Sequence, residues 1–160
     1  MRQLWAPWRM EFIRSADCAS ECFLCRAARG DDESLLLRRG NACFCMLNRY
    51  PYSNGHLLIS PLRHVAGLEH LTDAEMLDLL RLARDGRAAL AAAANAHGYN
   101  LGLNLGRAAG AGLEDHLHLH LVPRWIGDTN FMPVVGDVKI IPQALAEMAD
   151  LLRRHWPEGT

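Results

Sequence analysis

His116-Leu117-His118-Leu119-His120-Leu121-Val122 is the segment that decides the fold class of this chain. Histidine alternates with an aliphatic residue, which predicts a β-strand because successive side chains on a strand point to opposite faces. The three histidines then share one face, accessible or facing a ligand, and the aliphatic residues share the other, which belongs to the core. A strand of this kind requires a neighbouring sheet and a covering layer.

The rest of the chain supplies that sheet and that layer. Thr72 followed by Glu75 is a capping box, and apolar residues recur behind it at helical spacing, which predicts a helix from about Asp73 to Ala96 that stops at Gly98. Pro142 predicts the start of a second helix that ends near His155. Apolar runs and turn residues predict a hairpin of residues 35–38 and 43–47 and two further strands at 56–60 and 100–105. The predicted fold is α+β, with a mostly antiparallel sheet, one long helix and one C-terminal helix, in a single domain over residues 1–160.

Bulk composition excludes several classes of partner. The 160 residues include 17 basic and 18 acidic side chains, for a formal net charge of -1. Without a global basic field, neither a nucleic acid polymer nor an anionic membrane is the expected ligand, and no segment is apolar enough over roughly 20 residues to span a bilayer. The first ten residues lack the apolar core of a secretion signal, so the expected location is cytoplasmic.

Three histidines on one strand face admit three interpretations. They form a hydrogen-bonded polar edge, or two of them chelate zinc, or a central neutral imidazole acts as a nucleophile that its neighbours orient. A single metal shared by all three is excluded, because Cα atoms four positions apart on a strand lie roughly 13 Å apart. Nucleophilic catalysis is the interpretation that uses all three residues.

With this segment the chain resembles the histidine-triad superfamily, whose signature is three histidines alternating with apolar residues. The resemblance extends from about Cys22 to Pro123 and rests on several spaced motifs. They are His116 to Val122, Leu47-Asn48-Arg49 with Pro51, Gly55-His56-Leu57-Leu58-Ile59-Ser60-Pro61 with His64, and Asn104-x-Gly106.

The resemblance implies a homodimer with a sheet continued across the subunits, and a reaction at the α-phosphate of a nucleotide. His118 is then the nucleophile that forms a covalent nucleotidyl-histidine, and His120 contacts the phosphate. The same resemblance places Asn48 and His56 at the nucleoside end and Asn104 near the phosphate. Without this resemblance, the expected role of Asn48 is that of a turn residue and the expected role of His56 is the cap of a strand.

The segment just before the triad departs from the family pattern. Many relatives have glutamine and then serine or threonine where this chain has Gly112 and Leu113. Gly112 and Leu113 have no polar side chain to offer to a phosphate. The glycine-rich run 108–112 can instead offer backbone N–H groups, as such loops do around phosphates, although a flexible loop has the same composition.

Cys22 and Cys25 have the spacing of half a tetrahedral zinc site and lie in the N-terminal segment 1–34. The resemblance to zinc-containing branches of the superfamily implies His64 and His116 as the other two ligands, which makes zinc a structural cofactor and gives His116 a structural role inside the catalytic triad. The alternatives are a reduced pair packed as small apolar residues, or an iron–sulfur spacing that includes Cys18. Cys43 and Cys45 alternate in an apolar run and are expected in the core.

Both ends of the chain resemble bacterial triad proteins similar to diadenosine tetraphosphate phosphorylases. The matching segments are Leu4 to Met10 and Val122 to Phe131, with Trp5, Trp8 and Trp125 as stacking, dimer-contact or core residues, and Arg124 as a phosphate contact or a surface residue. The leading hypothesis is cleavage of diadenosine polyphosphates by phosphorolysis or hydrolysis. A purine nucleoside phosphoramidase and a non-catalytic nucleotide-binding regulatory module are the alternatives.

Overall fold

The computed structural model describes residues 22–31, 33–128 and 141–158. Its helices are α2 (Phe23–Arg29), α3 (Asp73–Ala94) and α5 (Leu145–Arg154), with 3-10 turns η1 (Leu68–His70) and η2 (Arg107–Ala109). Its strands are β1 (Leu36–Arg39), β2 (Cys43–Leu47), β3 (Leu57–Pro61), β4 (Gly98–Leu103) and β5 (Leu119–Arg124). Residues 1–21 and 129–140 lie outside this description, and with them Trp5, Trp8, Cys18 and the end of the second matching segment.

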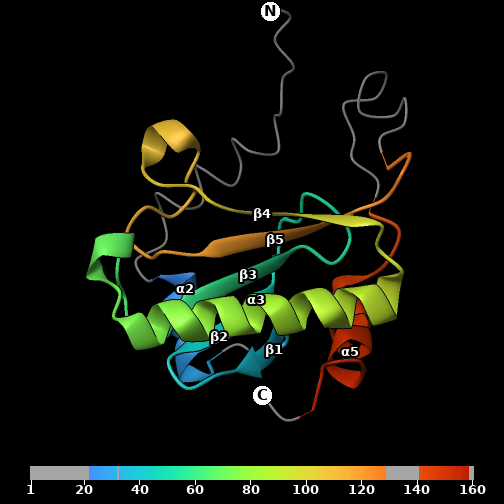
Figure 1. The fold of residues 1–160 in the computed structure, drawn as a ribbon, viewed down its shortest axis with the longest axis horizontal. Coiled ribbons are helices and arrows are strands. Elements are labelled where there is room, and N and C mark those ends of the chain that lie inside the picture. Colours follow the sequence, from blue (N-terminus) through green and yellow to red (C-terminus); the bar gives the residue numbers. More distant parts are fainter. Residues whose placement is uncertain (1–21, 32, 129–140, 159–160) are drawn as a thin grey trace, which may run out of the picture.

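The five strands form one sheet in the order β1-β2-β3-β5-β4, and every neighbouring pair is antiparallel. The long helix α3 crosses in front of this sheet in Figure 1, and α5 lies at one end of it. The predicted α+β class, with a mostly antiparallel sheet and one long and one C-terminal helix, is therefore confirmed.

The pairing register separates the two faces of the sheet. Leu57 pairs with Leu121, and Leu58 pairs with His120. Because side chains alternate along a strand, Leu57 and Leu121 face one side and Leu58 and His120 face the other. The first face is the one that α3 covers, since the side chains of Leu57 and Leu121 are among the three nearest to Gly86 on that helix. His120 therefore projects from the face opposite to α3.

Helix α3 begins as the sequence predicts and ends slightly earlier. The Thr72 hydroxyl accepts from the Glu75 backbone N–H, and the Glu75 carboxylate accepts from the Thr72 N–H. At the other end Asn95 adopts a left-handed conformation with φ of 48° and terminates the helix. Gly98, the predicted stop, instead opens β4, because an asparagine tolerates the left-handed region and ends the helix first.

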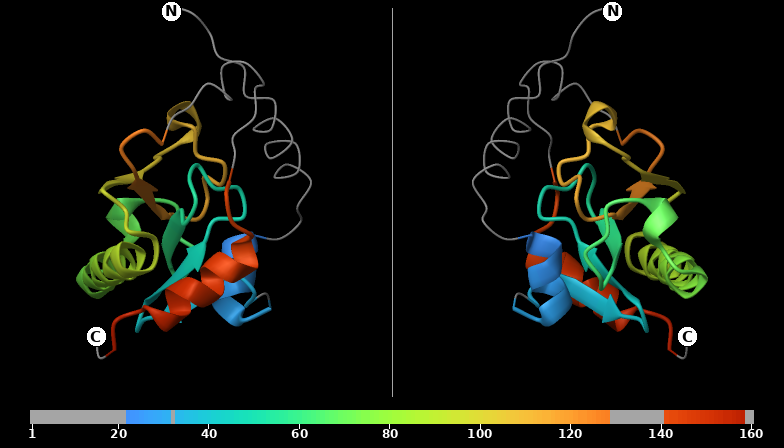
Figure 2. Two further views of the ribbon diagram at one scale, coloured as in Figure 1. Left: turned by 90° about the vertical axis from the view of Figure 1, so that its right-hand side faces the viewer. Right: turned by 90° about the vertical axis from the view of Figure 1, so that its left-hand side faces the viewer.

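Helix α5 starts at Leu145 rather than at Pro142, and it packs against α3 and β1. Its Arg153 guanidinium donates to the backbone carbonyls of Glu33, Ser34 and Leu36, at distances of 2.7 to 3.0 Å. One edge of the sheet is thereby capped by an arginine. Figure 2 shows α5 and α2 close together in both side views, and α3 on the other side of the strands from α2.

Two local features differ from the prediction. The ladder of the triad strand begins at Leu119, so His116 and His118 precede β5 in an irregular stretch. Cys22 to Arg29, which no helix was predicted to include, forms a cap and the short helix α2. Cys43 and Cys45 are fully buried in β2, as expected for core residues.

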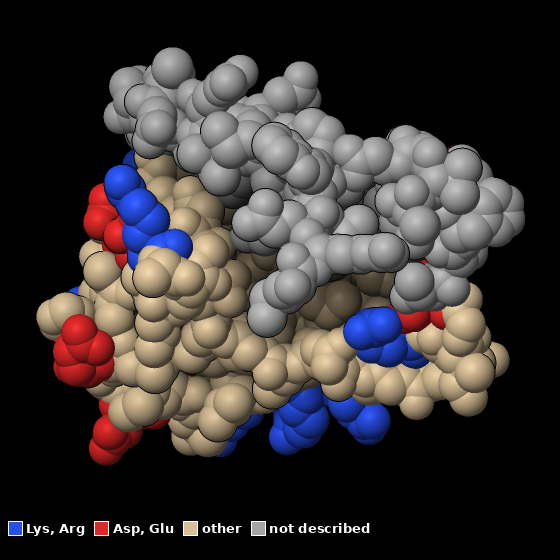
Figure 3. Space-filling model, turned by 90° about the horizontal axis from the view of Figure 1, so that it is seen from above, with Lys and Arg blue, Asp and Glu red and all other residues tan. Residues whose placement is uncertain are grey.

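The described surface carries no strong charge pattern on the face seen from above. In Figure 3 the acidic and basic side chains of the described residues form small separate groups among uncharged ones. In the same described ranges, no helix is long and apolar enough to cross a membrane.

Candidate active site and metal centre

A group of four sulfur and nitrogen ligands lies where α2 meets the sheet. Cys22 caps the N-terminus of α2 and Cys25 lies in its first turn, while His64 follows β3 and His116 precedes β5. Their ligand atoms all lie within 4.8 Å of one another. The Cys22 Sγ is 3.3 Å from the His116 Nδ1, and the Cys25 Sγ is 3.1 Å from the His64 Nδ1.

These separations fit a tetrahedral ion. Bonds of about 2.0 to 2.3 Å place neighbouring ligand atoms roughly 3.5 Å apart. The His116 Nε2 donates to the Pro61 carbonyl at 2.9 Å, so the neutral ring keeps the lone pair of Nδ1 free on the side of the sulfurs. Burial lowers the pKa of His116, which favours the neutral form that binds a metal. Cys22, Cys25, His64 and His116 could therefore hold one metal ion.

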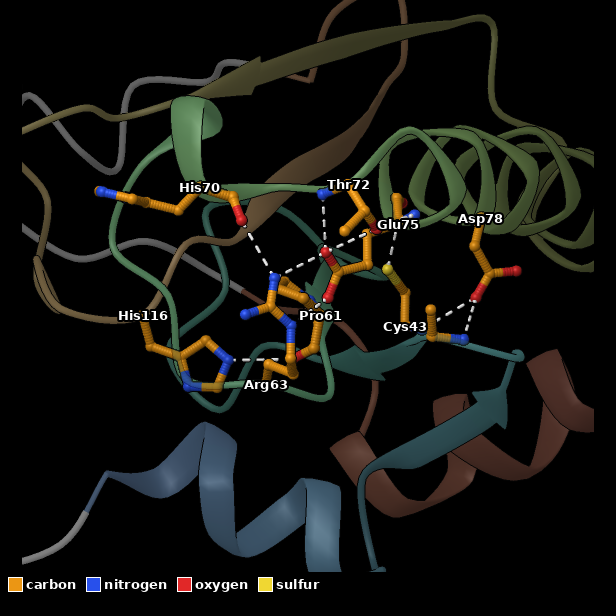
Figure 4. Close-up of polar contacts among 9 residues, drawn as sticks. Cys43, Pro61, Arg63, His70, Thr72, Glu75, Asp78 and His116 are labelled. Carbon is orange, nitrogen blue, oxygen red and sulfur yellow. Dashed lines mark hydrogen bonds and ion pairs between the residues drawn. The ribbon is translucent and has the colours of Figure 1, made fainter.

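An ion pair fastens the loop that carries His64. The Arg63 guanidinium contacts both carboxylate oxygens of Glu75, at 2.7 and 2.8 Å, and donates to the His70 carbonyl at 3.0 Å. Hydrogen bonds from Arg63, and next from the Thr72 backbone, lower the pKa of Glu75 to about 2. Figure 4 shows this network beside the bond from His116 to Pro61. The capping box of α3 thus also restrains the residue next to a metal ligand.

His118 is held in one tautomer by the backbone of His116. Its Nδ1 lies 2.9 Å from the His116 carbonyl oxygen, which can only accept, so Nδ1 carries the proton. The ring is 8 % exposed, and this burial lowers the pKa of His118. A neutral imidazole with Nδ1 protonated has its lone pair on Nε2, the arrangement that a nucleophile needs.

His120 belongs to a second polar cluster. Its Nδ1 lies 2.9 Å from the Nε2 of His56, and the Nδ1 of His56 lies 3.2 Å from the Asn48 amide nitrogen. On the other side, the Asn104 amide nitrogen is 3.5 Å from the His120 Nε2. The ends of β2 and β4, the start of β3 and β5 itself therefore bring together four of the residues that the sequence singled out.

This second cluster lies beside His118. The rings of His118 and His120 have centroids 4.9 Å apart in an edge-on arrangement. Burial, and next the neighbouring His118, lower the pKa of His120 to about 4. The triad thus combines a first histidine that faces two cysteines with a third that faces histidine and asparagine side chains.

Three further residues that the sequence singled out, Gly112, Arg124 and Trp125, have no described contact with either cluster. Gly112 is half-buried in the loop before the triad, and no described contact joins it to the histidines. Arg124 forms an ion pair with Asp128, and the Trp125 indole donates to the Ala94 carbonyl at the end of α3. Both of these side chains therefore have structural partners.

Tyr52 and Arg63 were not among the residues that the sequence singled out, and Glu75 was expected only to cap the long helix. Tyr52 lies against the His56 and His120 rings, and the other two residues restrain the loop of His64. The capping box was a signal for Glu75, but nothing in the sequence shows that its carboxylate also receives Arg63. Tyr52 stands in the Asn-Arg-Tyr-Pro-Tyr turn, four residues before His56, and this spacing alone does not reveal ring contact.

Comparison with known proteins agrees with this geometry. The model of the HIT domain matches residues 29–125. A protein of Mycobacterium tuberculosis named AP-4-A phosphorylase is 38% identical over 165 residues, which cover 98% of this chain and 85% of that protein.

Solved structures share the fold. A Zn-bound histidine triad family protein from Mycobacterium smegmatis superposes with a TM-score of 0.69 at 24% identity, covering 84% of this chain and 92% of the other. A HIT family protein from Bacillus anthracis gives a TM-score of 0.62 at 27% identity, covering 68% and 77%. The chain therefore belongs to the HIT-domain family, and its nearly full-length match to a phosphorylase makes it an enzyme of that family.

Proposed function

We propose that the protein cleaves diadenosine polyphosphates at the α-phosphate through a covalent nucleotidyl-His118. The observation that carries the proposal is the hydrogen bond between His118 Nδ1 and the His116 carbonyl, which leaves the Nε2 lone pair free beside the cluster of His120 and Asn104. The similarity to AP-4-A phosphorylase supports the choice of substrate.

In the first step, His118 Nε2 attacks the α-phosphorus, a P–N bond forms, and the bond to the bridging oxygen of the polyphosphate breaks. For diadenosine tetraphosphate the leaving group is ATP, and AMP stays on His118. Substitution at Nε2 makes the ring a cation, and the His116 carbonyl that accepts from Nδ1 stabilises this charge. In the second step an oxygen of inorganic phosphate attacks the same phosphorus, which releases ADP and restores neutral His118.

Donors around the phosphoryl oxygens must stabilise the transition state. The amide of Asn104 and the Nε2 of His120 face each other at 3.5 Å, so an oxygen placed against both can accept from both. Backbone N–H groups of the loop that contains Gly112 are the third source we propose. Asn48 and His56 take the nucleoside end.

The metal that we propose for the four-ligand group is zinc, because two thiolates and two imidazoles are a ligand set typical of tetrahedral structural zinc. All four positions are protein ligands, so the ion has no open position for substrate. Bound there, zinc would join α2 to His116, whose backbone carbonyl accepts the hydrogen bond from His118, and it would act on the reaction through position alone.

We further propose a homodimer through the open edge of β4. The edge at β1 is capped by Arg153, whereas β4 pairs only with β5 in the described chain, and Leu101 and Leu105 near it are about half exposed. An exposed apolar edge strand is a template for pairing with another chain. Light scattering should give the mass of a dimer, and Leu101→Lys should shift it towards a monomer.

One assay separates the candidate reactions. The protein is incubated with diadenosine tetraphosphate with and without inorganic phosphate, and separately with adenosine phosphoramidate, and products are identified by mass. ADP and ATP formed only with phosphate support phosphorolysis, whereas AMP and ATP without phosphate indicate hydrolysis. An inert dinucleotide together with a cleaved phosphoramidate refutes the proposed substrate, and no turnover of either refutes catalysis at this site.

A further inference from the structure

Tyr52 contacts the second histidine cluster in two ways. Its backbone N–H donates to the His56 Nδ1 at 3.1 Å. Its ring stacks on His56, with centroids 4.7 Å apart and planes 29° apart, and also lies over His120 at 5.8 Å and 20°. One residue of the turn between β2 and β3 thus touches both imidazoles.

The backbone contact determines where His56 carries its proton. An amide N–H can only donate, so the Nδ1 of His56 must be an unprotonated acceptor. Asn48 imposes the same requirement, because its Oδ1 accepts from the Tyr50 N–H at 3.0 Å and this turns its NH₂ towards the His56 Nδ1. Neutral His56 therefore has its proton on Nε2.

That proton determines the tautomer of His120 in turn. The His56 Nε2 lies 2.9 Å from the His120 Nδ1, so His56 donates and His120 accepts. If His120 carried its proton on Nδ1, two N–H groups would face each other at hydrogen-bond distance, which is unfavourable. Neutral His120 therefore has its proton on Nε2. The Asn104 amide nitrogen lies 3.5 Å from this nitrogen, beyond the usual hydrogen-bond distance, so both groups can remain donors.

We propose that Tyr52 is a positioning residue that, through His56, keeps the proton of His120 on the nitrogen that faces the phosphate. Its N–H orders the His56 tautomer, and its ring packs on both imidazoles, whose planes are tilted by 37° to each other, and so holds one in line with the other. The proposal rests on the proposed function, since it assigns the His120 N–H to a phosphoryl oxygen. Tyr52 itself does not touch the reacting atoms.

Histidine ring ¹⁵N NMR and steady-state kinetics on the full-length protein test this role with three substitutions. The wild type should show unprotonated Nδ1 and protonated Nε2 for both His56 and His120. Tyr52→Ala keeps the backbone N–H, so His56 should keep its tautomer, but it removes the ring that packs on both imidazoles. The His120 signals should then average between tautomers and kcat should fall roughly tenfold, with a smaller change in KM, because the His120 donor is needed mainly in the transition state. Tyr52→Phe retains the ring and should keep the wild-type tautomers and most of the turnover.

The outcomes separate the inference from its alternatives. A single unchanged tautomer and an unchanged kcat in Tyr52→Ala overturn it, as does a loss in Tyr52→Phe equal to that in Tyr52→Ala. If Tyr52→Ala does not fold, Tyr52→Leu, which retains bulk without an aromatic ring, undergoes the same measurements. The tautomer readout needs no substrate, so a wild type that leaves diadenosine tetraphosphate intact refutes the proposed function and still tests the effect of Tyr52 on His120.

Discussion

His116 and His120 lie four residues apart in one segment, yet the structure gives the same side chain opposite surroundings. His116 is fully buried and turns its Nδ1 towards two sulfurs, with its Nε2 fixed by the Pro61 carbonyl. His120 is only partly buried and turns its Nδ1 towards another imidazole. The first environment suits a metal ligand and the second a proton donor, with His118 between them as the nucleophile in our proposal. The difference shows that neighbours from other parts of the fold, the helix α2 among them, assign the role of an imidazole.

Removal of His118 has the largest expected effect on turnover, because His118 is the proposed nucleophile and His116 and His120 only position or assist it. His118→Ala should lower kcat by more than about a thousandfold and leave the fold intact. Product formation from diadenosine tetraphosphate and circular dichroism measure the two quantities. His155→Ala, at the end of α5 and outside both clusters, is the matched histidine control. Retained turnover in His118→Ala would contradict the assignment.

Removal of the His120 donor should lower turnover less than removal of His118. His120→Asn should lower kcat by roughly a hundredfold, because one positioned donor is lost at the phosphate while the nucleophile remains. The metal content should stay at the wild-type value, since His120 lies outside the four-ligand group. Kinetics together with metal analysis test this, and a variant that lost its metal would show that the two ends are not independent.

Disruption of the four-ligand group around His116 should first lower metal content and stability. Cys22→Ser should abolish stoichiometric zinc and lower the melting temperature, with turnover falling as a consequence. Cys45→Ala weakens the core away from the cluster and is the control that separates lost stability from lost metal. Unchanged zinc in Cys22→Ser would exclude this ligand set.

Acid should lower the stability of the fold through His120 and Glu75 in successive pH ranges. The pKa of His120 falls from 6.5 to about 4 on folding, so between these values the unfolded chain binds more protons and stability decreases as the pH falls. The pKa of Glu75 falls from 4.5 to about 2, which adds a further loss below pH 4.5. Each contribution is at most on the order of 3 kcal/mol.

Urea denaturation across these ranges tests the order of the two losses. The difference between wild type and His120→Asn should change between pH 6.5 and about 4, and the difference between wild type and Glu75→Gln should change below pH 4.5. For His120→Asn, comparison with the wild type at the same pH removes the contribution of metal release, which both proteins share. Glu75→Gln and its wild-type reference are compared after zinc removal, because this substitution is itself expected to weaken zinc binding. A difference that stays constant with pH would show that the group does not titrate as proposed.

The smallest effect is expected from the ion pair behind His64. Glu75→Gln weakens the contact to Arg63 and should lower zinc affinity by about tenfold, the range typical of residues that orient a ligand. Competition with a chelator measures this affinity. Asp150→Asn, which removes the acidic partner of Arg153 on α5, is the control and should retain zinc as the wild type does.

Sequence periodicity predicted most of the architecture. Strict alternation in the triad, the apolar runs and the capping box depend on local physics, and they gave five strands and two helices close to their observed positions. The short helix α2 was missed because seven residues show too little periodicity, and because Cys22 offers no side-chain hydrogen bond as a cap. The start of the triad strand was placed too early, since alternation of residues continues past the point where strand pairing begins.

The sequence by itself determined the family, the sheet with its long helix, and the set of cysteines and histidines from which a site can be built. The resemblance to the family already implied that His116 lies with Cys22 and Cys25, and the structure brings these ligand atoms together. Only the tertiary structure decided that His120 lies against His56 and Tyr52. The physical reason is that a strand pattern determines which face a side chain points to, whereas its hydrogen-bond partners come from segments up to 94 residues away in the chain. Those partners set the tautomer and the charge of each imidazole, and therefore its chemistry.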